Sequence, residues 1–125
     1  MKVYFDNAAT TPLDPQVIEC MTDVMKNFYG NPSSIHAYGR EVRALIEEAR
    51  KKIASYFNVT PGEIFFTSGG TEADNMAIRC AIEDLGVKNI ITSPIEHHAV
   101  LHTAEEMDHE GKAKLHLVKL DSKGH

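Results

Sequence analysis

The chain has 125 residues, the length of one ordinary domain, which is enough to bury a core. Its 42% hydrophobic and 25% charged residues are typical of a soluble globular protein, and its formal charge of −5 argues against a nucleic-acid partner. The N-terminus lacks the apolar core of a signal peptide, and no apolar run approaches the ~18 residues of a membrane span. We therefore expect a cytoplasmic protein with no membrane partner.

The first third of the chain predicts an arm followed by a helix. Residues 1–13 are polar and rich in turn formers, so we expect an N-terminal arm. Asp14 followed by Pro15 is a typical helix start, and the apolar residues that follow fall on one face. This amphipathic helix should end at Gly30, which can adopt the left-handed conformation of a helix cap.

A second, longer helix is predicted downstream of Gly30. Ser33 or Ser34 can cap it, and its apolar positions keep helical spacing as far as Phe57, with charged residues covering the other face. The segment 60–63 has the form of a capping box, a Thr followed three residues later by a Glu, and predicts a single further turn.

The remaining residues alternate between strands and helices. We expect strands starting at Ile64 and covering 89–92 and 114–120, and helices over about 71–85 and 97–110. The first of these helices is apolar nearly all round and should be buried. This alternation predicts an α/β fold, with a mainly parallel sheet, flanking helices and right-handed crossovers.

The predicted sheet is incomplete. Three strands and two preceding amphipathic helices leave apolar faces without a partner, so we expect residues 14–125 to be the first part of a larger domain. The arm of residues 1–13 would precede it.

A glycine turn between the first strand and its helix is the strongest local signal. Ser68, Gly69, Gly70 and Thr71 put backbone N–H groups at a helix N-terminus, where the helix dipole favours an anion. The spacing does not fit a nucleophile elbow, a dinucleotide fingerprint or a nucleotide-hydrolase phosphate loop, because the required glycines or lysine are missing. A cup for one phosphate and a purely structural turn both remain open.

Three histidines cluster where the second strand meets the next helix. The spacing places His97 on the inward face of that helix, where it is either a functional residue or a hydrogen-bonded core histidine. His98 and His102 lie one turn apart on the polar face and could clip a metal ion, but no third ligand is evident, so we expect no metal. Cys20 and Cys80 have neither metal-ligand nor disulfide spacing.

Four motifs together identify a family resemblance. In order, they are the segments 4–12 (YFDNAATTP), 30–34 (GNPSS), 66–75 (FTSGGTEADN) and 93–97 (SPIEH). Each motif is modest alone, but their order and spacing closely resemble the cysteine desulfurases among the class V aminotransferases. The likeness covers the whole chain and implies the N-terminal part of the large domain of a pyridoxal-phosphate-dependent transferase.

The resemblance also implies roles for particular residues. Gly70 and Thr71 match positions that hold the phosphate of pyridoxal 5'-phosphate. His97 matches a histidine that stacks on the pyridine ring and is a candidate acid or base. The first two motifs match segments near the substrate entrance of a homodimer.

The same resemblance implies the activity of the full-length protein. It would remove sulfur from L-cysteine, giving L-alanine and an enzyme persulfide for iron–sulfur cluster or thio-cofactor assembly, with a sulfur-acceptor or scaffold protein as a possible partner. The Schiff-base lysine, the aspartate that pairs with the pyridine nitrogen and the persulfide-forming cysteine have no match in this sequence. We therefore expect the 125 residues alone to be inactive. The alternatives are a selenocysteine lyase or another class V enzyme and, from a different class, a non-catalytic binding or assembly fragment of a split enzyme.

Overall fold

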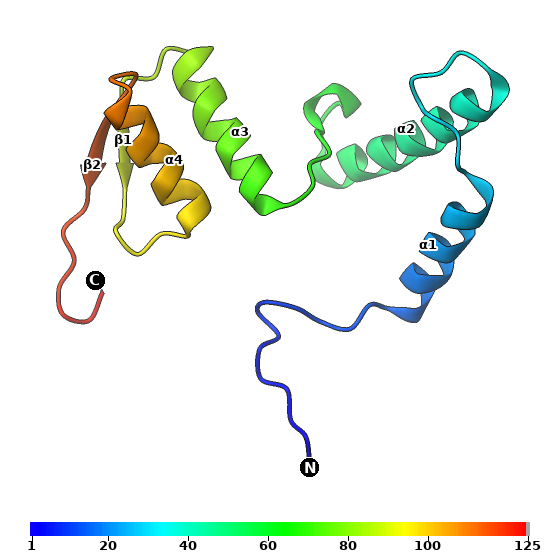
Figure 1. The fold of residues 1–125 in the computed structure, drawn as a ribbon, viewed down its shortest axis with the longest axis horizontal. Coiled ribbons are helices and arrows are strands. Elements are labelled where there is room, and N and C mark those ends of the chain that lie inside the picture. Colours follow the sequence, from blue (N-terminus) through cyan, green and yellow to red (C-terminus); the bar gives the residue numbers. More distant parts are fainter. Residues whose placement is uncertain (125) are drawn as a thin grey trace. The chain divides into compact units, whose positions relative to one another are not determined.

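The structure is a computed structural model that describes residues 1–124, and it divides into two compact units (Figure 1). The first unit covers residues 1–64 and the second begins at Phe65. Because the positions of the two units relative to one another are not determined, each is described by itself. The helix α1 (Pro15–Asn27), the helix α2 (Ala37–Phe57) and the 3-10 helix η1 (Pro61–Glu63) belong to the first unit.

The start of α1 confirms the sequence prediction. Asp14 is its N-cap, and a side-chain oxygen of Asp14 accepts a hydrogen bond of 2.8 Å from the backbone N–H of Gln16. Residues 1–13 contain a turn, in which the N–H groups of Ala9 and Thr10 donate to the carbonyl of Asp6, and neither a helix nor a strand. Their role as an arm stays a prediction.

The predicted left-handed cap at Gly30 is wrong. The helix α1 ends at Asn27 with Phe28 as its C-cap, and Gly30 does not adopt the left-handed conformation. A Cβ atom on Gly30 would lie 2.4 Å from the carbonyl oxygen of Tyr38, so a glycine is needed here for close approach of two backbones. Beside this contact the rings of Tyr29 and Tyr38 stack with their centroids 5.5 Å apart.

The predicted serine cap of α2 is also wrong. His36 is the N-cap, and its Nδ1 atom accepts a hydrogen bond of 3.3 Å from the N–H of Gly39. The serines belong to the preceding turn, because the N–H groups of Ser33 and Ser34 donate to the side-chain and backbone oxygens of Asn31. A turn formed around Asn31 leaves no serine at the helix start.

The capping box at η1 is confirmed. Both the backbone N–H and the hydroxyl of Thr60 donate to Oε2 of Glu63, each at 2.7 Å. These two hydrogen bonds hold the pKa of the Glu63 carboxyl below its ordinary value, and the bond from the Thr60 hydroxyl has the larger effect.

The second unit is a strand–helix–strand unit preceded by a helix. It contains the helix α3 (Gly70–Glu83), the strand β1 (Asn89–Thr92), the helix α4 (His98–His109) and the strand β2 (Lys114–Leu117). The strands β1 and β2 are parallel, with Ile90 opposite Leu115. This arrangement confirms the α/β fold class, because the helix α4 forms the crossover connection between two parallel strands (Figure 1).

The predicted strand at Ile64 is wrong in this structure. Residues 64–67 are not assigned to a strand, although Ile64 has extended dihedral angles of φ −99° and ψ 121°. A strand needs a hydrogen-bonded neighbour, and the sheet formed by the described residues contains only β1 and β2. The apolar sequence therefore produces an extended segment without a ladder.

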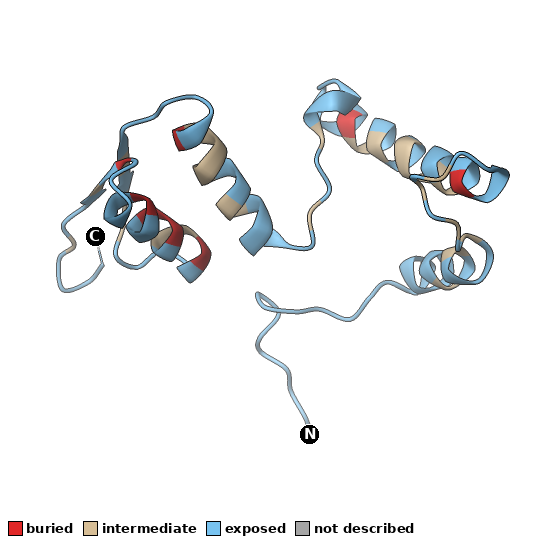
Figure 2. Cartoon of the chain, turned by 45° about the horizontal axis from the view of Figure 1, so that its top comes forward, coloured by how far each residue is buried: buried red, intermediate tan, exposed pale blue. Residues whose placement is uncertain are grey.

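The core of the second unit lies between α3, α4 and the strands. Ile82, Met107 and Ala113 are buried, and the partly buried Ile78 and Ile90 pack against them. Figure 2 shows the buried residues concentrated along α4. The prediction that α3 is buried all round is wrong, because Ile82 is its only buried residue. On another face of the same helix, the side chain of Met76 is 41% exposed.

No helix formed by residues 1–124 combines the length and the apolar character that crossing a membrane requires.

Candidate functional site

The glycine turn places free backbone donors at the start of α3. Gly69 is the N-cap with an extended backbone, φ 169° and ψ 177°, and the helix begins at Gly70. The N–H of Ala73 is the first to bond back, to the carbonyl of Gly69 at 3.2 Å, so the N–H groups of Gly70 and Thr71 have no partner inside the helix. Apart from neighbouring residues and the backbone of the helix itself, no heavy atom lies within 4 Å of a Cβ built on Gly69 or Gly70, so the space beside these two residues is open.

One carboxylate braces this turn. Oε2 of Glu72 accepts hydrogen bonds from both the backbone N–H and the hydroxyl of Ser68, each at 2.7 Å. The hydrogen bonds from Ser68 hold the pKa of the Glu72 carboxyl below its ordinary value, and the bond from the hydroxyl has the larger effect. This side chain is therefore ionised at neutral pH. The brace spans the two glycines and leaves the N–H groups of Gly70 and Thr71 unoccupied.

His97 is the N-cap of α4. Its Nδ1 atom accepts a hydrogen bond of 3.1 Å from the backbone N–H of Ala99. The side chain is exposed, and Ala99 is the buried residue of that first turn, so the predicted inward position of His97 is wrong. The physical reason is that the helix begins one residue later than the spacing suggested. Because Nδ1 accepts a hydrogen bond, the proton of the neutral ring is on Nε2.

A single cavity brings Thr71 and His97 together. It has a volume of about 350 Å³ and lies between α3 and α4. The α3 wall carries Thr71, Asn75 and Arg79, which are spaced by four residues and therefore share one helix face. The α4 side contributes, besides His97, the residues His98, Ala99, His102, Thr103 and Glu106. Gly70 is not part of this lining and adjoins it only through Thr71.

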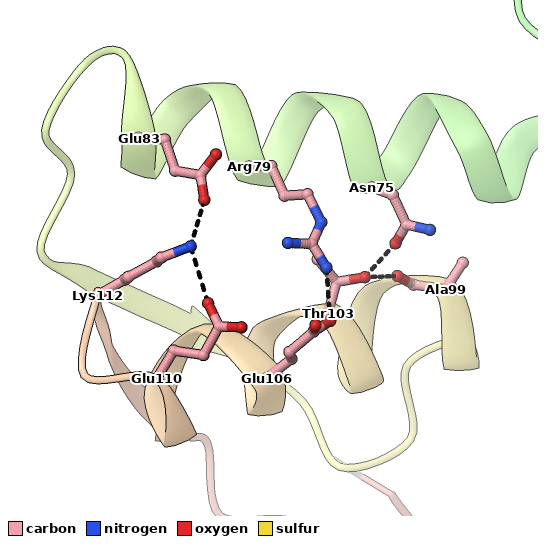
Figure 3. A network of polar contacts seen from close by, with 8 residues as sticks. All are labelled: Asn75, Arg79, Glu83, Ala99, Thr103, Glu106, Glu110 and Lys112. Carbon is pink, nitrogen blue, oxygen red and sulfur yellow. Dashed lines mark hydrogen bonds and ion pairs between the residues drawn. The ribbon is translucent and has the colours of Figure 1, made fainter.

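Sequence reasoning missed the polar contacts that fix the width of this cavity (Figure 3). The hydroxyl of Thr103, which is only 5% exposed, hydrogen-bonds to the side chain of Asn75 and also to the carbonyl of Ala99 at 2.8 Å. The hydroxyl faces two acceptors, Oδ1 of Asn75 and the carbonyl oxygen of Ala99, and because it has one proton it donates to one of them at a time. The sequence signal was the spacing of Asn75 one helical turn after Thr71.

Ion pairs tie the same two helices further along. Arg79 contacts Glu106 at 2.5 Å, and Lys112 contacts Glu83 at 2.6 Å and Glu110 at 2.8 Å (Figure 3). Hydrogen bonds to Glu110, which has the larger effect, and to Glu83 raise the pKa of Lys112 above its ordinary value. These partly exposed pairs each contribute little to stability, but together they connect α3 with α4 and with the turn that precedes β2.

His98 and His102 lie on the exposed face of α4, as the spacing predicted, with ring centroids 4.8 Å apart. Within residues 1–124 there is no group of three or more His, Cys, Asp or Glu side chains placed to hold a metal ion.

Comparison with known proteins adds the family. Residues 3–125 match the family described as Aminotransferase class-V. The chain belongs to the class-V aminotransferase family. Within this family it is 51% identical over 113 residues to "Putative cysteine desulfurase IscS 1" of Bacillus subtilis (strain 168), covering 88% of this chain and 30% of that protein. It is 52% identical over 112 residues to "Cysteine desulfurase IscS" of Dictyoglomus turgidum, covering 88% of this chain and 28% of that protein.

Solved structures of class-V relatives share the fold. A "NIFS-LIKE PROTEIN" superposes with a TM-score of 0.86 at 44% identity, covering 98% of this chain and 34% of that one. The structure described as "SspA in complex with cysteine" gives a TM-score of 0.81 at 33% identity, covering 94% of this chain and 34% of that one. The chain thus spans about 30% of the length of the curated relatives it matches.

Proposed function

We propose that this chain is the N-terminal portion of a pyridoxal-phosphate-dependent cysteine desulfurase, in which Gly70, Thr71 and His97 contribute to the cofactor site. The observation that carries the proposal is the cavity shared by Thr71 and His97. The family resemblance assigns these two residues to the phosphate end and the ring end of one cofactor. The identity of 51–52% to relatives named as cysteine desulfurases supports the substrate, L-cysteine.

The residues present fit the phosphate of pyridoxal 5'-phosphate. The N–H groups of Gly70 and Thr71 are free donors at a helix N-terminus, and the Thr71 hydroxyl adds a third donor. The absence of side chains on Gly69 and Gly70 leaves room for an anion to reach the backbone. When bound, the cofactor supplies an electron sink for the carbon chemistry of the amino acid.

His97 is proposed as an acid or base beside the cofactor ring. Its Nδ1 atom is engaged by Ala99, so any proton that it gives or takes moves through Nε2. The helix cap also fixes the orientation of the imidazole without help from another side chain. His97 lies at the start of α4, in the loop that follows the carboxyl end of β1. In parallel α/β folds, ligands bind at the carboxyl ends of the strands.

The remaining parts of the proposal concern the assembled enzyme. We propose a homodimer that passes sulfur to an acceptor or scaffold protein in the cytoplasm. The 125 residues by themselves should not release sulfur, because the lysine and the persulfide-forming cysteine of the family have no match in them. The structure of SspA with cysteine supports the choice of substrate by analogy.

The test uses the full-length gene product. Purified with pyridoxal 5'-phosphate, it should be yellow and should convert L-cysteine into L-alanine and sulfide with a reductant present. A colourless protein after addition of the cofactor, or one that releases selenium from L-selenocysteine but no sulfur from L-cysteine, contradicts the proposal. The 125-residue chain, assayed in parallel, should show no turnover.

A further inference from the structure

Two short hydrogen bonds between Ser68 and Glu72 brace the candidate phosphate cup. Both donors of Ser68 reach the same carboxylate oxygen, Oε2 of Glu72, at 2.7 Å. The enclosed residues Gly69 and Gly70 are the least restrained residues of a polypeptide, and no heavy atom comes within 4 Å of their would-be Cβ positions. Side-chain packing therefore does not hold the turn, and hydrogen bonds do: the two short ones of the brace and a longer one of 3.2 Å from the Thr67 hydroxyl to the carbonyl of Gly69.

We propose that Glu72 is a positioning residue for the phosphate end of the cofactor, holding the turn so that the N–H groups of Gly70 and Thr71 converge on one point. This inference rests on the proposed function and adds a residue to it. Glu72 acts through Ser68 and the backbone and does not itself donate to an anion. Preorganised donors bind an anion more tightly than mobile ones because less conformational entropy is lost on binding.

The charge of Glu72 has the opposite effect on affinity. A carboxylate near a phosphate dianion repels it, although solvent screens this repulsion because Glu72 is exposed. Two substitutions separate the effects. Glu72→Ala removes both the brace and the charge, whereas Glu72→Gln removes the charge and keeps an oxygen that can accept from Ser68.

The chain offers a matched control in its first unit. Glu63 accepts from the N–H and hydroxyl of Thr60 with the same two distances of 2.7 Å, and it does not line the cavity. Glu63→Ala therefore removes an equivalent brace from a turn that has no proposed ligand. Any loss of cofactor affinity that comes merely from a looser capped turn should appear in this variant too.

The experiment measures binding to the cofactor-free full-length gene product. Absorbance or fluorescence titrations with pyridoxal 5'-phosphate and with pyridoxal, which lacks the phosphate, give dissociation constants for each variant. We expect Glu72→Ala to weaken pyridoxal 5'-phosphate binding on the order of three- to tenfold, the effect of losing about one ordinary hydrogen-bonded restraint. Glu72→Gln should stay within about twofold of the unmodified protein, and Ser68→Ala, which keeps the backbone donor, should fall between.

The pyridoxal titration and thermal unfolding distinguish positioning from general damage. Glu72→Ala should leave pyridoxal affinity unchanged, and Glu63→Ala should leave both affinities unchanged. Unchanged or tighter binding of pyridoxal 5'-phosphate by Glu72→Ala overturns the inference, as does an equal loss of affinity for both ligands. Failure of the unmodified protein to bind the cofactor contradicts the proposed function instead. If Glu72→Ala does not fold, Ser68→Ala decides on the same readouts.

Discussion

The Nδ1 atom of His97 and the backbone N–H of Ala99 form a hydrogen bond of 3.1 Å that makes one ring nitrogen a structural group. The other nitrogen, Nε2, keeps the exchangeable proton of the neutral ring. The same side chain thus starts the helix α4 and carries the proposed acid–base function. These two roles can be separated by substitution.

Replacement of His97 should affect stability and activity differently according to the residue introduced. His97→Ala loses the cap and should lower the free energy of unfolding by about 0.5–2 kcal/mol, whereas His97→Asn keeps a capping oxygen and should be nearly as stable as the parent. Both should lower the rate of sulfur release by the full-length gene product on the order of 10²- to 10⁴-fold. Denaturant unfolding and a sulfide assay check this. Full activity of His97→Asn would show that the ring does not take part in the reaction.

The Asn75–Thr103 contact should couple the two helices that form the cavity. Thr103→Val keeps the shape of a buried side chain but leaves the partner groups unsatisfied, and we expect a loss of about 1–3 kcal/mol. Asn75→Leu in the same protein should cost less than the sum of the two single substitutions, because the orphaned group is removed. Denaturant unfolding of the four proteins in the cycle gives the coupling energy. Strict additivity would show that the contact contributes nothing.

Glycine substitutions should separate close packing from open space. Gly30→Ala places a Cβ 2.4 Å from the Tyr38 carbonyl oxygen and should destabilise the first unit by about 1–3 kcal/mol. Gly70→Ala meets no atom within 4 Å and should leave stability unchanged and keep the backbone donor. Thermal unfolding of the two variants distinguishes these expectations. Equal unfolding temperatures for both would contradict the close approach at Gly30.

The carboxylates that brace the two turns should make stability fall in acid. Hydrogen bonds from Thr60 and Ser68 lower the pKa values of Glu63 and Glu72 in the folded protein. A group with a lowered folded pKa stabilises the protein above its unfolded pKa, and this contribution is lost as the pH falls through the folded pKa. Unfolding temperatures should therefore drop below about pH 4, where ordinary carboxyls protonate. The double variant Glu63→Gln, Glu72→Gln should show a shallower acid slope than the parent.

Lys112 should affect the stability of the protein at alkaline pH. Its raised pKa means that its contribution is present below the ordinary lysine pKa and is lost as the pH rises through the higher folded value. Stability should decline above about pH 10, and Lys112→Met should decline less over that interval. Thermal unfolding in alkaline buffers measures this. Identical alkaline slopes for the two proteins would exclude a role for the contacts of Lys112 with Glu83 and Glu110.

Elements with local signals were predicted well from the sequence. Asp14 caps α1, the box at Thr60 forms η1, and β1 covers the predicted residues 89–92. Each of these depends on neighbouring residues, such as a capping oxygen or a short β-branched run between turn formers. The candidate phosphate turn was found for the same reason, because a strand-like run, two glycines and a helix start are adjacent in the chain.

Features that depend on contacts further along the chain, or on a choice between competing turn formers, were not predicted. The need for a glycine at position 30 comes from the carbonyl of Tyr38, and the cap of α2 is His36 because Asn31 draws the serines into a turn. An apolar run at Ile64 cannot become a strand without a neighbour to pair with.

The sequence by itself determined the α/β class and the family, and it predicted Gly70, Thr71 and His97 as candidate cofactor residues. Only the tertiary structure decided that Thr71 and His97 line one cavity, because that depends on the packing of α3 against α4 and on the contact between Asn75 and Thr103. Local propensities fix where a helix starts, whereas the distance between two helices is set by side chains that are far apart in the chain.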